Sequence, residues 1–186
     1  MGKLFDSIDT GLRAFIEAQH MFFVATAPAA AGHVNLSPKG LDTLRVVSAD
    51  ELAYLDHIGS GAETIAHLRE NSRIVLMLCA FEGPPKIIRI HGRGDVIEPG
   101  DQGYDDFRVM FPPTPEGRAI IRVTVERISD SCGFGVPLYS YKGQRDQLEN
   151  WVERKGKQGL IDYQRGKNRT SIDGLPALKW TETKTL

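Results

Sequence analysis

The sequence predicts a mainly β fold with flanking helices, built on an antiparallel sheet. Four short segments, each apolar or alternating and separated by brief turns, follow one another: Met21 to Ala27, His33 to Gly40, Leu44 to Ser48 and Glu51 to Asp56. Consecutive strands with short links favour an antiparallel meander, and closing it into a barrel would remove its exposed edges. We therefore expect a meander that is able to close.

Size and composition indicate one domain over residues 1–186, with a helical C-terminal extension at about 142–180. A formal net charge of −1 gives no overall attraction to nucleic acid or to an anionic membrane, so neither is expected as a partner. The start of the chain lacks the basic and apolar regions of a signal peptide, which predicts a cytoplasmic location. Cys79 and Cys132 lack the spacing of a disulfide framework or a metal site, so no metal is expected.

The remaining periodicity predicts helices and strands in the following order. Helices are expected at residues 9–20, about 62–71, within 99–110, at 144–155 and at 160–167. Strands are expected at residues 73–81, 86–97 and 118–129. In the C-terminal helices, Trp151 and Tyr163 are interpreted as the face that docks on the sheet.

The stretch from His33 to Gly40 combines strand and turn chemistry. Pro38 lacks the N–H that the next ladder hydrogen bond needs, so the strand is expected to stop or bulge there. Ser37, Lys39 and Gly40 then offer a hydroxyl, a cation and a close backbone approach, which suits a phosphate group at a sheet edge. The alternative is an ordinary hairpin turn with a solvated lysine.

A second anion-binding stretch is predicted at the loop from His57 to Gly61. Its glycines and Ser60 directly precede a helix, whose first amides and positive dipole end would face a bound phosphate. Thr64, in the first helical turn, adds a hydroxyl. The alternative is that Ser60 only caps the helix.

Six segments in one order resemble a known family. They are Phe-Phe-Val-Ala-Thr-Ala, Val-Asn-Leu-Ser-Pro-Lys-Gly, Thr-Leu-Arg-Val, Asp-His-Ile-Gly-Ser-Gly, His-Leu-Arg-Glu-Asn-Ser-Arg and Ile-His-Gly-Arg-Gly, within residues 21–97. Together they resemble the pyridoxamine 5′-phosphate oxidase-like FMN-binding split-barrel family. The resemblance implies a six-stranded antiparallel split β-barrel and a homodimer that holds FMN non-covalently at the subunit interface.

The resemblance also implies cofactor-binding residues in this chain. They are Ser37, Pro38, Lys39 and Gly40, Arg45 on the adjoining strand, and His57, Ser60, Gly61 and Thr64 of the loop and helix, with Ser131, Cys132 and Gly133 near the flavin. Lys39 and Arg45 are the strongest candidates, because a dianionic phosphate needs cations as well as amide donors.

Two departures from the family bear on function. Ala62, Glu63 and Thr64 stand where the family commonly offers arginine or lysine, so the phosphate contacts would depend on hydroxyls and on Lys39. The arginine- and histidine-bearing end that binds substrate phosphate in true pyridoxamine-phosphate oxidases has no match. The end of this chain, including Ser171 to Pro176, instead resembles an uncharacterised bacterial branch of the family.

The sequence thus predicts a flavoprotein that uses FMN to move a hydride or electrons between a reduced donor, such as a nicotinamide, and an unidentified small molecule. No residue is identified as catalytic. Two alternatives stay open: a non-catalytic module that binds flavin, the deazaflavin F420 or haem, and a divergent pyridoxamine 5′-phosphate oxidase.

Overall fold

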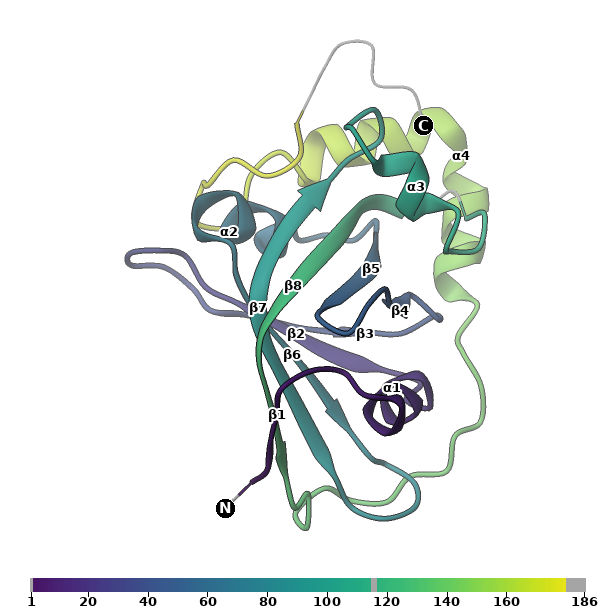
Figure 1. Cartoon of the computed structure of the whole chain (residues 1–186). Helices are drawn as coiled ribbons and strands as arrows, with labels where there is room; N and C mark the ends of the chain where they lie inside the picture. The colour runs from purple at the N-terminus through teal and green to yellow at the C-terminus, as the bar shows by residue number, and fades with distance from the viewer. Residues whose placement is uncertain (1, 115–116, 180–186) are drawn as a thin grey trace.

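The computed structural model describes residues 2–114 and 117–179, and Figure 1 gives the labels used below. Its strands are β1 (Leu4–Phe5), β2 (Phe22–Thr26), β3 (Asn35–Lys39), β4 (Leu44–Val46), β5 (Glu51–His57), β6 (Arg73–Cys79), β7 (Ile87–Ile97) and β8 (Gly117–Ser131). Its helices are α1 (Thr10–Glu17), α2 (Glu63–Asn71), α3 (Tyr104–Arg108) and α4 (Gln147–Lys167). The expected end of the C-terminal extension, residue 180, lies outside the described residues. No described helix is long and apolar enough to cross a membrane.

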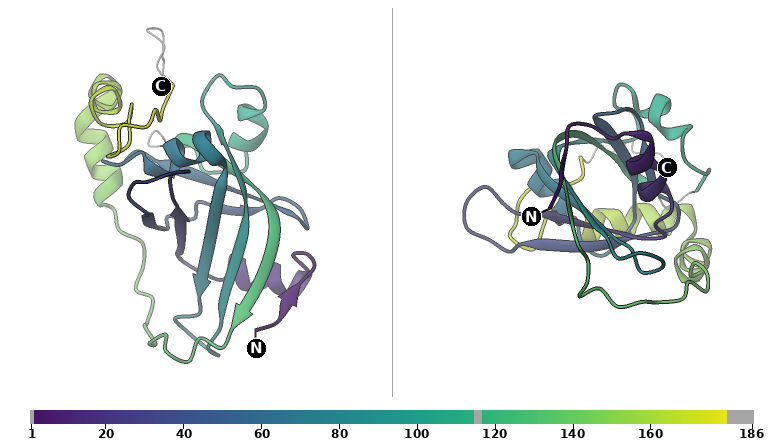
Figure 2. Two further views of the ribbon diagram at one scale, coloured as in Figure 1. Left: turned by 90° about the vertical axis from the view of Figure 1, so that its left-hand side faces the viewer. Right: turned by 60° about the horizontal axis from the view of Figure 1, so that its bottom comes forward.

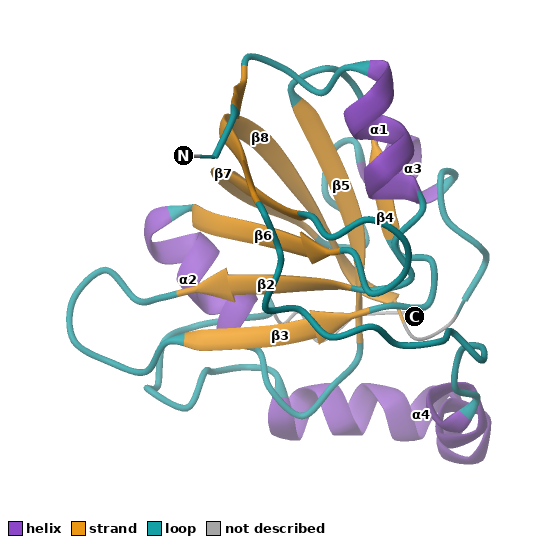
Figure 3. Cartoon of the chain, turned by 90° about the horizontal axis from the view of Figure 1, so that it is seen from below, coloured by secondary structure: helices purple, strands orange, loops and turns teal. Residues whose placement is uncertain are grey.

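The strands form one antiparallel sheet in the order β3-β2-β6-β7-β8-β5-β4, with β1 paired to β8. The sheet curls so that β3 and β4 approach each other, as Figure 3 shows from below, yet these end strands are not paired within the described residues. The predicted mainly β, split-barrel architecture is therefore confirmed. A β1 strand was not predicted; its two residues are too few to carry a period.

The predicted meander is wrong in one connection. The hairpins β2–β3 and β4–β5 form as expected, but β3 and β4 lie at opposite ends of the strand order. Leu41 and Asp42, in the link between them, adopt φ of 59° and 53°, which turns the chain away instead of into a tight hairpin. β2 pairs with β6 and β5 pairs with β8, so long-range partners decide the topology.

The prediction that the strand stops or bulges at Pro38 is wrong. β3 continues to Lys39, and Pro38 pairs in register with Phe23 of β2. An edge strand has only one ladder partner, so the N–H that proline lacks is not required on the open side.

The core lies inside the curled sheet. Alternating residues of the long strands fill it, among them Ile88 and Ile90 of β7 and Ile121 and Val123 of β8, as their period predicts. α1 covers one end of the sheet with Leu12 and Ile16, and α2 packs with Ile65 and Leu68. The remaining buried members of this main cluster include Val24, Leu52, Tyr54, Ile74, Leu76, Leu78 and Ile128.

α4 consists of two helical segments that meet at a kink, which agrees with the two helices predicted in this region. Gly156, with φ of 62° and ψ of 172°, is non-helical and separates the two segments. Trp151 and Tyr163 meet edge to face at 4.9 Å and pack on the cluster of Ile58, Val152 and Leu160. α4 therefore docks beside the loop after β5, as the two aromatics predicted, and Figure 2 shows it on one side of the sheet.

The pairing of β7 with β8 has a bulge between His91 and Gly92, and a substitution at Gly92 tests how closely these two strands pack. A Cβ at position 92 would clash with the carbonyl oxygen of Thr124, which belongs to the paired strand and has no freedom to move. We expect Gly92→Ala to lower the free energy of unfolding by about 1–3 kcal/mol in urea titrations. Gly135→Ala is the control, because its Cβ would meet open space at a φ that alanine tolerates; equal losses in both variants would contradict the bulge geometry.

Candidate functional site

A cleft of about 360 Å³ opens where the end of β3 faces the start of α2. It lies between the end strand β3 and the residues where β5 leads into α2. Its lining comes from β3 and the turn after it, the β5–α2 junction, β8 and α4: Asn35, Ser37, Pro38, Lys39, Gly40, Leu41, Thr43, Leu55, His57, Ile58, Gly59, Gly61, Glu63, Thr64, Arg118 and Leu148. The two stretches predicted to bind an anion thus lie on facing walls of one cleft.

An ion triad joins the walls of the cleft. The Asp56 carboxylate, with 0% of its side chain exposed, accepts from Lys39 Nζ at 2.6 Å and from Arg118 Nε at 2.8 Å. Burial alone would raise the pKa of Asp56, but Arg118 and Lys39 together hold that pKa well below its ordinary value. Asp56 is therefore ionised behind the cleft, and it fixes the ammonium of Lys39 at the cleft wall.

Gly59 ties this triad to the helical extension. Its carbonyl oxygen accepts from Asn168 Nδ2 at 2.8 Å, just past the end of α4, and also faces Arg118 Nη1 at 3.4 Å. The β5–α2 loop is consequently held by Asn168 on one side and by Arg118 on the other. These contacts fix the loop backbone before any ligand binds.

A hydrogen-bond network centred on Asn35 orders the hydroxyls of the other wall. Asn35 Nδ2 donates to Thr64 Oγ1 at 2.9 Å and to Thr26 Oγ1 at 3.1 Å, while Asn35 Oδ1 accepts from Ser37 Oγ at 2.9 Å. Because Thr64 accepts from Asn35, its own proton is available to the cleft. The Ser37 hydroxyl donates its hydrogen bond to Asn35, so toward the cleft its oxygen offers lone pairs.

The network continues to a buried histidine. The Thr26 hydroxyl, which accepts from Asn35, also forms a hydrogen bond with His67 Nδ1, 3.0 Å away. His67 is fully buried in α2, and burial lowers its pKa. Nε2 has no hydrogen-bond partner among the described residues. The network therefore runs from the cleft to the buried ring of His67.

The start of α2 adds backbone donors. The residue before the helix is Ala62, and no side chain caps the first turn, so the N–H groups there are uncapped at the positive end of the helix dipole. Glu63 also lines the cleft, and its Oε1 accepts from the N–H of Ile172. The positive charges of Lys39 and Arg118 are balanced by the negative charges of Asp56 and Glu63. Because the formal charges around the cleft cancel, binding of an anion would depend on hydrogen bonds from side-chain and backbone donors.

His57 contributes a neutral imidazole to the cleft. Burial lowers the pKa of His57 from 6.5 to about 4, and the charges of Lys39, Arg108 and Arg118 add to this against the opposing effect of Asp56. We expect the ring resonances of His57 to stay unshifted in an NMR titration from pH 8 to 5.5.

The same depressed pKa has a consequence for stability. Between pH 6.5 and about 4 the unfolded chain binds a proton at position 57 that the folded chain does not, so unfolding becomes easier as pH falls through this window. His57→Gln should reduce this pH dependence in urea titrations. A midpoint for His57 near 6.5 would contradict the buried placement.

The structure does not bring every predicted residue to this cleft. Arg45 lines a separate hollow beside α1, where Nη1 donates to Asp42 Oδ1 at 2.9 Å and Nε donates to the Met110 carbonyl at 2.9 Å. Ser60 lines a neighbouring hollow that shares Gly61 and Glu63 with the cleft.

The segment after β8 lies elsewhere in this chain. Ser131 Oγ accepts from Arg89 Nη1 at 2.8 Å at the end of the strand, and Cys132 and Gly133, which follow it, do not line the cleft. The other predicted residues, Ser37, Pro38, Lys39, Gly40, His57, Gly61 and Thr64, do line it.

Sequence reasoning missed Asp56, Arg118 and Asn35. Asp56 lies next to the end of β5 and Arg118 next to the start of β8, and a charged residue beside the end of a buried strand is the sequence signal that could have identified them. Asn35 belonged to the motif but was interpreted as a strand residue only. The described residues contain no cluster of histidine, cysteine and acidic side chains able to hold a metal ion.

The antiparallel split barrel places this chain in the class of split-barrel proteins, and its cleft beside β3 is lined by hydrogen-bond donors. The model of the family described as pyridoxamine 5′-phosphate oxidase matches residues 8–132. The chain is also 37% identical to the pyridoxamine 5′-phosphate oxidase family protein ustO of Aspergillus flavus, over 96% of this chain and 78% of that protein. This chain therefore belongs to the pyridoxamine 5′-phosphate oxidase family, as its motifs indicated.

Solved structures share the fold at low sequence identity. HupZ of Group A Streptococcus aligns with a TM-score of 0.53 and 21% identity, over 65% of this chain and 91% of that one. A putative pyridoxamine 5′-phosphate oxidase of Lactobacillus delbrueckii aligns with a TM-score of 0.53 and 16% identity, over 68% and 98%. These likenesses support the split-barrel fold and extend no further.

Proposed function

We propose that this protein binds FMN in the cleft and is an FMN-dependent oxidoreductase that acts on an unidentified small molecule. The observation that carries the proposal is the placement of Lys39, Thr64 and the uncapped start of α2 around one cleft. A phosphate ester needs a cation, hydroxyl donors and amide donors together, and family membership makes FMN the candidate that carries one.

The residues of the cleft fit the two ends of such a ligand differently. Thr64 and the α2 amides would donate to the phosphate, beside the ammonium of Lys39. Ser37, whose lone pairs face the cleft, would accept from a hydroxyl of the ribityl chain. Gly59 and Gly61 keep side chains off the loop, so the ligand can approach its backbone. FMN, when bound, supplies hydride or electron transfer.

The proposal includes a homodimer with the flavin at the subunit interface. It is supported by Leu36, on the edge strand β3 next to the cleft, whose side chain is apolar and 64% exposed. An apolar side chain on an open edge is a usual contact of a partner chain. Sedimentation equilibrium of the FMN-loaded protein is expected to give twice the chain mass.

The function is tested by flavin uptake followed by reduction. The purified protein is titrated with FMN, and the loaded protein is then mixed anaerobically with NADH or NADPH while absorbance near the flavin maximum is followed. Uptake and bleaching are expected. Failure to bind FMN would refute the proposal, whereas uptake without reduction by either nucleotide would favour a non-catalytic flavin-binding module.

The Asn35 network makes a specific prediction for FMN binding. Thr64→Val removes a hydroxyl donor at similar volume, and we expect the dissociation constant of FMN to rise about tenfold, the effect of one hydrogen bond to a charged group. Riboflavin, which lacks the phosphate, should bind Thr64→Val as it binds the wild type. Equal weakening of both ligands in calorimetric titrations would show that Thr64 supports the fold and does not contact the phosphate.

A further inference from the structure

Glu63, the first residue of α2, lies on the wall between two hollows. Its side chain lines the cleft and also the neighbouring hollow of about 470 Å³ whose lining includes Ser60. A Cβ added to Gly61 would clash with Glu63 Oε2, so the carboxylate packs directly against the backbone of that glycine. The carboxylate therefore occupies space that Gly61 leaves open beside the first turn of α2.

A backbone donor from the C-terminal region holds this carboxylate in place. Glu63 Oε1 accepts from the N–H of Ile172 at 3.1 Å, in the segment that follows α4. Asp173 anchors the same segment to the β2–β3 loop, because its carboxylate accepts from the N–H of His33 at 2.8 Å and contacts the His33 ring at 2.7 Å. The position of Glu63 at the cleft is thus defined by the fold and does not depend on a ligand.

The carboxylate of Glu63 has no cationic partner among the residues that the structure describes. Asp56, in contrast, is shared by Lys39 and Arg118, and these three groups together carry one net positive charge. Glu63 cancels that charge without pairing with either cation. An anion bound in the cleft therefore comes close to an unpaired carboxylate.

The effect of this carboxylate depends on the charge of the ligand. A phosphate monoester has a second pKa of about 6, so at neutral pH it is mostly a dianion, whereas a phosphodiester carries one negative charge. The proposed phosphate position, beside Thr64 and the first N–H groups of α2, lies in the helical turn that Glu63 begins. Like charges at such short range repel, and the repulsion grows with the charge of the phosphate. Glu63 therefore opposes a dianion more strongly than a monoanion.

From these features we propose that Glu63 is a specificity-determining residue of the cleft, which selects flavin phosphate groups with one negative charge over dianionic ones. The inference rests on the proposed function, because it takes the phosphate of a flavin as the anion at the start of α2. The substituent of a phosphodiester would extend into the neighbouring hollow, on the other side of Gly61 and Glu63. Lys39 and Thr64 still favour a phosphate over none, so the preference for FMN over riboflavin is retained.

The test compares FMN, its monomethyl phosphate ester and riboflavin, which at about pH 8 carry about two, one and no negative charges at the end of the ribityl chain. Each is titrated calorimetrically into the wild-type chain and into Glu63→Gln, whose amide oxygen can still accept from Ile172. We expect Glu63→Gln to lower the dissociation constant of FMN about tenfold and that of the ester about threefold, because the repulsion is halved, and to leave that of riboflavin unchanged. Glu63→Ala should reproduce the order of these effects.

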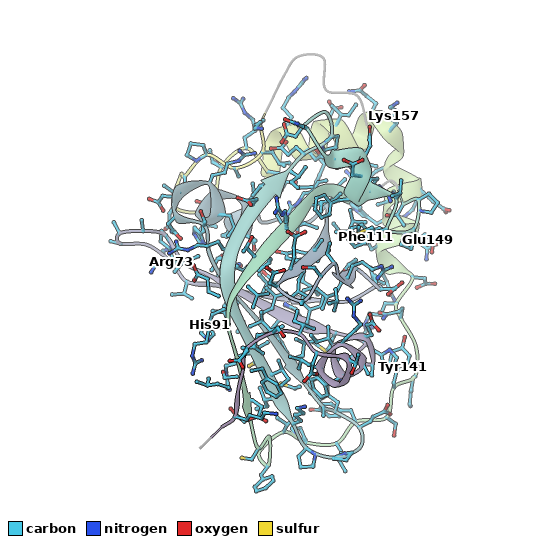
Figure 4. All side chains as sticks on the ribbon, viewed as in Figure 1. Arg73, His91, Phe111, Tyr141, Glu149 and Lys157 are labelled. Carbon is cyan, nitrogen blue, oxygen red and sulfur yellow. The ribbon has the colours of Figure 1, made fainter. Side chains whose placement is uncertain are left out.

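Two control variants remove the same charge elsewhere. Glu70 lies near the other end of α2 and does not line the cleft, and its carboxylate also accepts from a backbone N–H, that of Ala29 at 2.7 Å. Glu149, labelled in Figure 4, is exposed on α4 and follows the cleft-lining residue Leu148. Glu70→Gln and Glu149→Gln should leave all three affinities unchanged, and thermal melts verify that every variant folds.

The inference is overturned if the Glu63 variants leave the affinity for FMN unchanged, or if they tighten FMN and its methyl ester equally. It is also overturned if a control variant tightens FMN as much as Glu63→Gln does. Equal weakening of FMN and riboflavin by Glu63→Gln would overturn it too, because Glu63 would then accept from the ribityl chain. Absence of FMN binding to the wild type and to the Glu63 variants would refute the proposed function and the inference with it, whereas FMN binding that does not respond to Glu63 refutes the inference alone.

Discussion

Asp56→Ala is expected to lower the free energy of unfolding by about 3–5 kcal/mol. Asp56 is the shared acceptor of Lys39 and Arg118, and Arg118 is itself buried. Without the carboxylate, the guanidinium stays in a low-dielectric site, and its remaining hydrogen-bond partner among the described residues is the Gly59 carbonyl at 3.4 Å. An uncompensated buried charge costs more than the pair contributed, so the effect should exceed that of an ordinary cavity.

Urea denaturation of Asp56→Ala and of Glu51→Ala provides the measurement and its control. Glu51 pairs with Arg122 on the same two strands, β5 and β8, but at a partly exposed position. Such a pair contributes only about 0–1 kcal/mol. Equal losses in the two variants would mean that Asp56 does not hold the walls of the cleft together.

Lys39→Ala is expected to weaken FMN binding by about 1–3 kcal/mol, the scale of one charge-assisted contact. Lys39 is 18% exposed at the cleft, and Asp56 holds its ammonium from behind. Riboflavin should bind Lys39→Ala nearly as it binds the wild type, because the lost partner is specific to the phosphate. Isothermal titration of both ligands gives the difference directly.

Arg45→Ala is the informative comparison. The resemblance to the family assigned Arg45 to the phosphate, yet in this chain its guanidinium is held by Asp42 and the Met110 carbonyl outside the cleft. We expect Arg45→Ala to leave FMN affinity unchanged. If Arg45→Ala weakens FMN as much as Lys39→Ala does, the phosphate has been assigned to the wrong cations.

Local pattern predicted the hairpins, and the resemblance to the family brought together the two stretches predicted to bind an anion. Alternation identified both long strands, and Ser37 to Gly40 proved to face the His57–Thr64 junction because each lies at the end of a predicted element. Those features depend on nearby residues, so their sequence signal is direct.

Contacts between residues far apart in the sequence could not be predicted from local sequence pattern. Asp56 meets Arg118 because β5 pairs with β8, 62 positions along the chain, and no local signal encodes that partner. Arg45, which the resemblance assigned to the phosphate, lies outside the cleft because of a local contact. Asp42, three residues away in a turn with φ of 53°, captures its guanidinium locally. The hydroxyl network around Asn35 likewise includes His67, which comes from another element.

The central claim is that the cleft between β3 and α2 binds the phosphate of FMN. The most direct test is calorimetric titration of the wild-type protein with FMN and with riboflavin, which differ only in that phosphate. The account predicts that FMN binds at least about tenfold more tightly, and that most of this preference disappears in the Lys39→Ala and Thr64→Val variants. Equal affinities for FMN and riboflavin, or a preference that both variants retain in full, would contradict it.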